Sequence, residues 1–140
     1  MDAERKESRV SQKISFTVPL VPPGVNHYVK HTRSGRHYVT KEAIAFKETL
    51  AICARGFAVI GRRFQVEAII YLGHKGKGDV DGFAKLILDG LAKAGVFQKA
   101  NGRRPLVTPC QMSDAHVTDL ILRKRRDAKN PRTEFTIKAI

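Results

Sequence analysis

The chain has few of the residues on which small secreted or membrane proteins depend. Its 140 residues include two cysteines and no tryptophan, and no apolar run approaches the roughly 18 residues of a membrane helix. Cys53 and Cys110 have neither Cys-x-x-Cys nor zinc-module spacing, which excludes a disulfide framework and a zinc module. The opening residues 1–5 are charged, unlike a secretion signal. We therefore expect a cytoplasmic protein without membrane contact.

Acidic residues are also scarce. The chain has 13 Asp plus Glu against 26 Lys plus Arg, a formal net charge of +13. The resulting sequence pI of 10.2 is typical of a nucleic-acid-binding domain. A hydrophobic content of 42% argues against disorder, and this length suits one domain.

Alternating and helical periods predict the fold class. We expect an α+β domain over residues 13–140, with two helices packed on one mixed sheet of about four strands, after a flexible arm at residues 1–12. A basic hairpin or loop is predicted at 26–38, a long connection at 98–112 that includes Cys110, and a charged segment between the last two strands at 123–132. The predicted strands are 14–20, 64–72, 116–122 and 134–139, and the predicted helices are 40–56 and 79–95.

The most informative segment is Gly78-Asp79-Val80-Asp81-Gly82-Phe83-Ala84-Lys85. On a helix starting at Asp79, residues Asp81, Lys85 and Asp89 lie along one edge. One explanation is structural: Asp79 caps the helix, and Asp81 forms an ordinary ion pair with Lys85. The other is a metal site, since acids are rare in residues 71–120, where they number five: Asp79, Asp81, Asp89, Asp114 and Asp119.

The glycine-rich stretch before this segment does not predict a nucleotide site. Gly73 and Gly78 have the Walker spacing, but Asp79 stands where a lysine is needed, so we expect no nucleotide cofactor. Carboxylate oxygens select a hard cation such as Mg²⁺, for which Mn²⁺ can substitute. A cation held between the acids and a phosphate can polarise the phosphodiester, and Lys85 can offset the charge of the transition state. This chemistry indicates phosphodiester hydrolysis.

These residues resemble the RusA family of Holliday-junction resolvases. The resemblance spans roughly residues 14–140, and the acidic helix with its lysine is its specific part. The matching motifs are Asp79-x-Asp81-x3-Lys85, Leu88-Asp89-Gly90-Leu91, Gly95-Val96-Phe97, Asp114-Ala115-His116-Val117-x-Asp119 and the earlier Pro22-Pro23-Gly24-Val25-Asn26-His27-Tyr28.

The resemblance implies a Mg²⁺-dependent homodimeric endonuclease that nicks two strands symmetrically across a four-way DNA junction during recombination and repair. It places the metal-binding catalytic acids on Asp79, Asp81 and Asp114, and the catalytic lysine on Lys85. Asp89 and Asp119 also match acidic positions of the family, and we expect supporting or structural roles for them. Ser113 precedes Asp114 where the family has a second acid.

Several basic and polar residues are candidates for binding DNA, since each cation that neutralises a phosphate releases counterions. Each of these cations could instead be a solvated surface charge, and the two N-terminal candidates could instead fix the proline turn. The candidates are Asn26, Tyr28, Lys30, Arg33, Arg36, Lys75, Lys77, Arg103 and Arg104. The run at 123–126 either adds to this charge or forms a solvated turn.

Two other functions remain open at this stage. The chain could be a nuclease for another branched DNA, such as a flap or a replication fork. It could also be a non-catalytic basic DNA-binding protein whose acids only cap a helix. The sequence gives neither the cleavage-site preference nor the number of metal ions.

Overall fold

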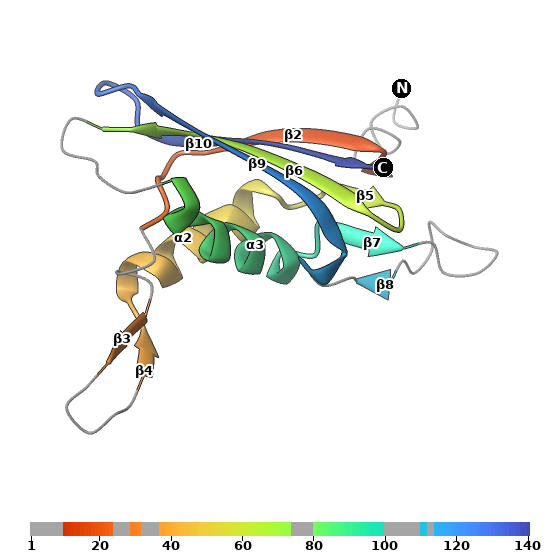
Figure 1. Cartoon of the computed structure of the whole chain (residues 1–140), viewed down its shortest axis with the longest axis horizontal. Helices are drawn as coiled ribbons and strands as arrows, with labels where there is room; N and C mark the ends of the chain where they lie inside the picture. The colour runs from red at the N-terminus through yellow and green to blue at the C-terminus, as the bar shows by residue number, and fades with distance from the viewer. Residues whose placement is uncertain (1–9, 24–28, 32–36, 74–79, 100–109, 112–113) are drawn as a thin grey trace.

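A four-stranded sheet of mixed direction organises the chain. The computed structural model describes residues 10–23, 29–31, 37–73, 80–99, 110–111 and 114–140. The strand order is β2-β10-β6-β9, with β10 antiparallel to both of its neighbours and β6 parallel to β9. This is the predicted α+β class: one small domain with two helices on a mixed sheet (Figure 1). The strands are β2 (Lys13–Val18), β6 (Phe64–Leu72), β9 (Val117–Arg126) and β10 (Arg132–Ala139).

Shorter strands extend the fold beyond the prediction. β1 (Val10–Ser11) pairs with β5 (Ala58–Ile60), β5 with β7 (Phe97–Lys99), and β7 with β8 (Cys110–Gln111). The end of the predicted arm at 1–12 is therefore paired, and Cys110 lies in a strand rather than a loop. The connection predicted at 98–112 likewise begins and ends in strands. Such short strands give no readable alternation, because their pairing partners are distant in sequence.

The basic segment at 26–38 contains a hairpin, one of the two forms predicted for it. Its strands are β3 (Val29–His31) and β4 (His37–Val39), which pair antiparallel. The hairpin extends away from the sheet and the helices (Figure 1).

The first long helix begins and ends as its sequence predicts. α2 (Lys41–Cys53) has Thr40 as its N-cap, and the Thr40 hydroxyl oxygen accepts a hydrogen bond of 3.3 Å from the Ala43 amide. Phe46 and Leu50 lie on its buried face. Gly56 follows with φ of 84°, a conformation that favours glycine.

The second helix differs from the prediction at its start. Residues Val80–Phe83 form a short 3₁₀ helix, η2, and the α-helix α3 spans Ala84–Lys93. Asp81 therefore lies in the 3₁₀ turn, not in an α-helix starting at Asp79. Gly82 disfavours the α-helix at this point, and 3₁₀ turns are common at helix starts. Gly95, with φ of 78°, ends the helix as expected.

The core lies between the main sheet and the two helices, which cover the same side of the sheet (Figure 1). The predicted apolar stripe of the second helix is buried at Phe83, Ile87 and Leu91. A Cβ built on Gly90 would lie 3.4 Å from the Cδ1 of Leu50, so the absence of a side chain lets α3 approach α2 closely. Within the described ranges, no helix is both long and apolar enough to cross a bilayer.

The strand β9 is longer than predicted. The sequence suggested a strand ending at Leu122 and a charged segment from Arg123, but the strand continues through Arg126. Four consecutive cations at residues 123–126 show no apolar–polar alternation, so the sequence does not mark this part of the strand; the turn is formed by the following Asp127-to-Pro131 stretch. Since β9 is the last strand in the order of the main sheet, its outer edge carries these cations.

Candidate functional site

The acidic segment is described in part. Asp79 lies outside the described residues, as do Lys75 and Lys77 before it, and Asp81 is described by its backbone in η2. Lys85 stands in the first turn of α3 with an exposed side chain. Asp81 and Lys85, which are predicted to be a catalytic acid and the catalytic lysine, thus lie at adjacent turns where α3 begins.

The edge of α3 that carries Lys85 faces α2. Lys47 of α2 is partly buried, and desolvation lowers the pKa of its ammonium group. Lys93 and Lys85 also lower this pKa, whereas the carboxylate of Asp89 raises it. Asp89, which is half-buried, therefore offsets positive charge between the two helices, and a supporting role at the acidic site stays a prediction.

Asp114 belongs to a second 3₁₀ turn, η3 (Asp114–His116), directly before β9, and it too is described by its backbone. η3 contacts α3, and η2 contacts both α3 and β9. The parallel register sets Val117 opposite Phe64, at the start of β6, whereas η2 follows the end of β6. Binding of one ion by Asp79, Asp81 and Asp114 remains a prediction, because their side chains lie outside those described.

Asp119 is separated from the acidic helix by the sheet. It is exposed on β9 and pairs in register with Gln65. Residues opposite one another on neighbouring strands share a face, and Gln65 alternates with the buried Val66, which faces the helices. Asp119 is therefore on the face of the sheet opposite α3.

The end of β9 presents four exposed cations on two faces of the sheet edge. Lys124 pairs with Ile70 and Arg126 with Leu72, both buried residues on the helix side of β6. Arg123 and Arg125 pair with Ile69 and Tyr71, on the open side of the sheet. These cations were predicted to form a charged segment between strands, and their division between two faces follows from the register with β6.

The β9–β10 turn holds the end of β6 in place. The Arg126 guanidinium donates to the Gly73 carbonyl oxygen at 2.8 Å, and the Asp127 amide donates to the Leu72 carbonyl oxygen at 2.9 Å. A Cβ on Gly73 would lie 3.0 Å from Cγ of Pro131. Gly73 is the residue from which the chain leaves toward Asp79, so this turn fixes where the acidic connection starts.

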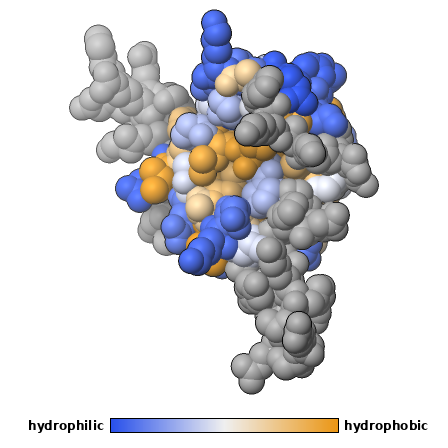
Figure 2. Space-filling view, turned by 90° about the vertical axis from the view of Figure 1, so that its left-hand side faces the viewer, coloured by the Kyte–Doolittle hydropathy of each residue, from blue (hydrophilic) through white to orange (hydrophobic). Residues whose placement is uncertain are grey.

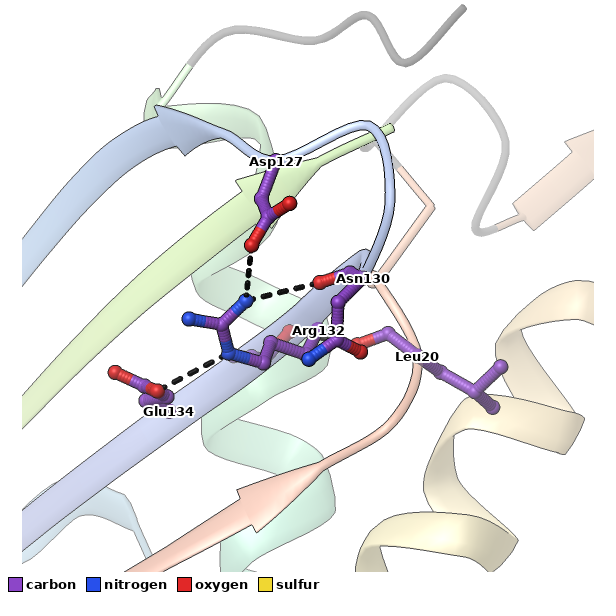
Figure 3. Close-up of polar contacts among 6 residues, drawn as sticks. Leu20, Asp127, Asn130, Arg132 and Glu134 are labelled. Atoms are coloured by element: carbon purple, nitrogen blue, oxygen red, sulfur yellow. Dashed lines mark hydrogen bonds and ion pairs between the residues drawn. The ribbon is translucent and has the colours of Figure 1, made fainter. Parts of the chain in front are cut away.

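Arg132 stabilises the turn itself (Figure 3). Its guanidinium donates to the Asp127 carboxylate at 2.8 Å, to the Asn130 carbonyl at 3.0 Å and to the Glu134 carboxylate at 3.1 Å. It also lies 3.9 Å from the ring centroid of Tyr71, a cation–π geometry. The hydrogen bond from Arg132 is the largest cause of the lowered pKa of Asp127.

The remaining DNA-binding candidates fall mostly outside the described residues. Lys30 is in β3, where its backbone is described. Nothing is described for the others: Asn26, Tyr28, Arg33, Arg36, Arg103 and Arg104.

A hollow lies between α2 and α3 among the described residues, lined by Ile44, Lys47, Glu48, Ala51, Gly90, Lys93 and Ala94. Its exposed lining is mainly apolar, with two lysines and one glutamate. Figure 2, which views the molecule from the left of Figure 1, shows hydrophilic residues toward the top of this side and a hydrophobic area beneath them. Among the described side chains, no three of His, Cys, Asp or Glu gather as metal ligands.

Comparison with known proteins identifies no family for this chain, so a function can be argued only from the residues of the site. No family model matches the chain, and no curated protein matches it in sequence.

Proposed function

We propose that this protein is a Mg²⁺-dependent endonuclease that nicks DNA at four-way junctions. The observation that carries the proposal is the position of Asp81 and Lys85 at the start of α3, with η2 in contact with a strand that ends in exposed cations. Carboxylates in such a basic surface repel phosphate unless a cation lies between them. An acidic turn beside a basic strand suits metal-assisted attack on a phosphodiester.

The donor set fits a hard cation. Asp79, Asp81 and Asp114 offer oxygen ligands only, which Mg²⁺ prefers, and Mn²⁺ would be accepted as well. A bound cation would polarise the phosphodiester and lower the pKa of an attacking water. Lys85, exposed one turn after Asp81, would offset the negative charge that develops on the phosphate oxygens.

Symmetric cutting would need two such sites. A homodimer with a two-fold axis presents identical sites to the pseudo-symmetric arms of a junction, so we propose a dimer as the active form. The motif resemblance to RusA resolvases supports the same assembly and a cytoplasmic role in recombination and repair.

The test is cleavage of a synthetic four-way junction with and without Mg²⁺. We expect the wild type to nick only with the metal. Asp81→Asn should nick at least about 10³-fold more slowly, since the loss of one charged ligand removes several kcal/mol of charge stabilisation. Asp119→Asn is the matched control, with the same chemical change on the opposite face of the sheet. Nicking by Asp81→Asn at the wild-type rate would reject this mechanism.

A non-catalytic DNA-binding protein is the second candidate, and the exposed basic end of β9 is compatible with it. It predicts that Mg²⁺ leaves junction DNA intact and that Asp81→Asn strengthens binding by removing a repulsive charge. A nuclease for flaps or forks would instead cut those substrates faster than the junction. Rates on all three DNAs at equal salt separate these functions.

A further inference from the structure

The four cations at the end of β9 are adjacent in sequence but divide into two pairs in space. Lys124 and Arg126 lie on the side of the sheet that the helices cover, and Arg123 and Arg125 lie on the open side. Both pairs are exposed, both belong to one strand, and each carries two positive charges. Any difference between their roles must therefore come from what each face adjoins.

The helix-side pair lies on the side of the sheet where α3 packs. The turn η2, which contains Asp81, contacts both α3 and β9. Within this pair, Arg126 donates a hydrogen bond to the carbonyl of Gly73, at the start of the connection to Asp79. The open-side pair faces the other way, since Arg123 and Arg125 are in register with Ile69 and Tyr71 on the uncovered face.

We propose that Lys124 and Arg126 form the phosphate-binding subsite for the DNA strand that enters the acidic site. Two residues along a strand advance roughly 6.6 Å, so the side chains of i and i+2 can contact successive phosphates of one DNA strand. A guanidinium carries several N–H donors in a fixed fork, which allows Arg126 to bridge the Gly73 carbonyl and a phosphate. The cations thereby offset the repulsion between the aspartates and the DNA.

This inference rests on the proposed nuclease function and adds to it the residues that position the substrate. It assigns Lys124 and Arg126 as binding residues and leaves Arg123 and Arg125 as solubilising charges. Charges on an exposed edge also discourage pairing with another sheet, so the open-side pair has a physical role without DNA.

The experiment compares two double variants of the full chain with the same change in charge: Lys124→Gln/Arg126→Gln and Arg123→Gln/Arg125→Gln. Junction binding is measured by fluorescence anisotropy over a salt series without Mg²⁺, and single-turnover nicking is measured with Mg²⁺. We expect the helix-side variant to bind about 10-fold or more weakly and to lose close to two units of the salt slope. The open-side variant should bind within about 3-fold of the wild type.

A conservative variant separates binding from loop positioning and from misfolding. Lys124→Arg keeps the charge and leaves the hydrogen bond between Arg126 and Gly73 intact, so it should bind the junction within about 3-fold of the wild type if phosphate binding is the role. Equal weakening by the helix-side and open-side variants, or failure of the charge-conserving variant to bind, would overturn the inference. If the wild type binds the junction but does not nick it with Mg²⁺, the proposed nuclease function fails instead, while the subsite is still judged by the binding data.

Discussion

β6 and β9 are neighbouring parallel strands in register, yet their side chains differ in burial and charge. β6 alternates buried and half-buried residues along its whole length, from Phe64 to Leu72. β9 is mostly exposed and ends in four cations. The difference follows from position, because β6 has a partner on each side, whereas β9 is the last strand in the order of the main sheet.

On the proposed function, this contrast separates the residues that stabilise the core from those that would bind DNA. The central strand packs its apolar face against the helices and supports the core. The end of the edge strand is exposed and does not form part of the core. Its successive charged side chains therefore lie on two different faces of the sheet. The acidic turn η2 contacts this edge strand. The end of the strand carries exposed cations where β6 carries buried apolar side chains.

The largest effect on stability is expected at the centre of β6. Ile70 is fully buried, so Ile70→Ala should lower the free energy of unfolding by about 2–5 kcal/mol through lost burial and a cavity. Leu120 of β9 is 36% exposed on the same side of the sheet, so Leu120→Ala should cost less than about 1 kcal/mol. Urea denaturation measures both. Equal costs would remove the distinction between the two strands.

An intermediate effect is expected just before β6. A Cβ on Gly61 would lie 2.6 Å from Cβ of Ala139, so Gly61→Ala should destabilise by about 1–3 kcal/mol through overpacking. The double variant Gly61→Ala/Ala139→Gly removes the clash and should recover part of this loss. Additive costs in the urea denaturation of the single and double variants would show that the two positions do not meet.

The smallest effect is expected at the β9–β10 turn. The pKa of Asp127 is lowered mainly by its hydrogen bond from Arg132, so this carboxylate stabilises the fold above its unfolded-state pKa. That contribution is lost as the pH falls through the lowered pKa. The melting temperature of the wild type should exceed that of Asp127→Asn near pH 6, and the difference should shrink below about pH 4.

Arg132→Gln provides the control for this titration. Without the guanidinium, the Asp127→Asn change should produce a smaller pH-dependent difference in melting temperature than it does in the wild type. A difference that stays constant from neutral to acidic pH would assign the effect of Asp127 to the shape of the turn instead of its charge.

Much of the fold could be predicted because its signals are local. Thr40 and Gly56 mark the ends of α2, and the alternation from Phe64 to Leu72 matches the observed strand β6 residue for residue. The start of α3 could not be located, because a capping acid and a 3₁₀ turn carry the same sequence signal. The short strands β1 and β8 were missed since their partners lie far along the chain.

The candidate site was less predictable than the fold. The motif resemblance grouped Asp89 and Asp119 as supporting or structural acids, and the structure separates them: Asp89 lies between the helices and Asp119 across the sheet from them. The division of residues 123–126 into two faces depends on the register with β6, which only the paired structure supplies. The metal ligands themselves were proposed from motif and charge.

The sequence by itself determined the helix and strand periods, the basic character and the acidic motif, because these depend on neighbouring residues and on the sum of charges. Only the tertiary structure decided which strand lies at the edge, that η2 packs against it, and which cations share its face. Those features arise from pairing between segments that are distant in the chain, and no local pattern specifies such a register.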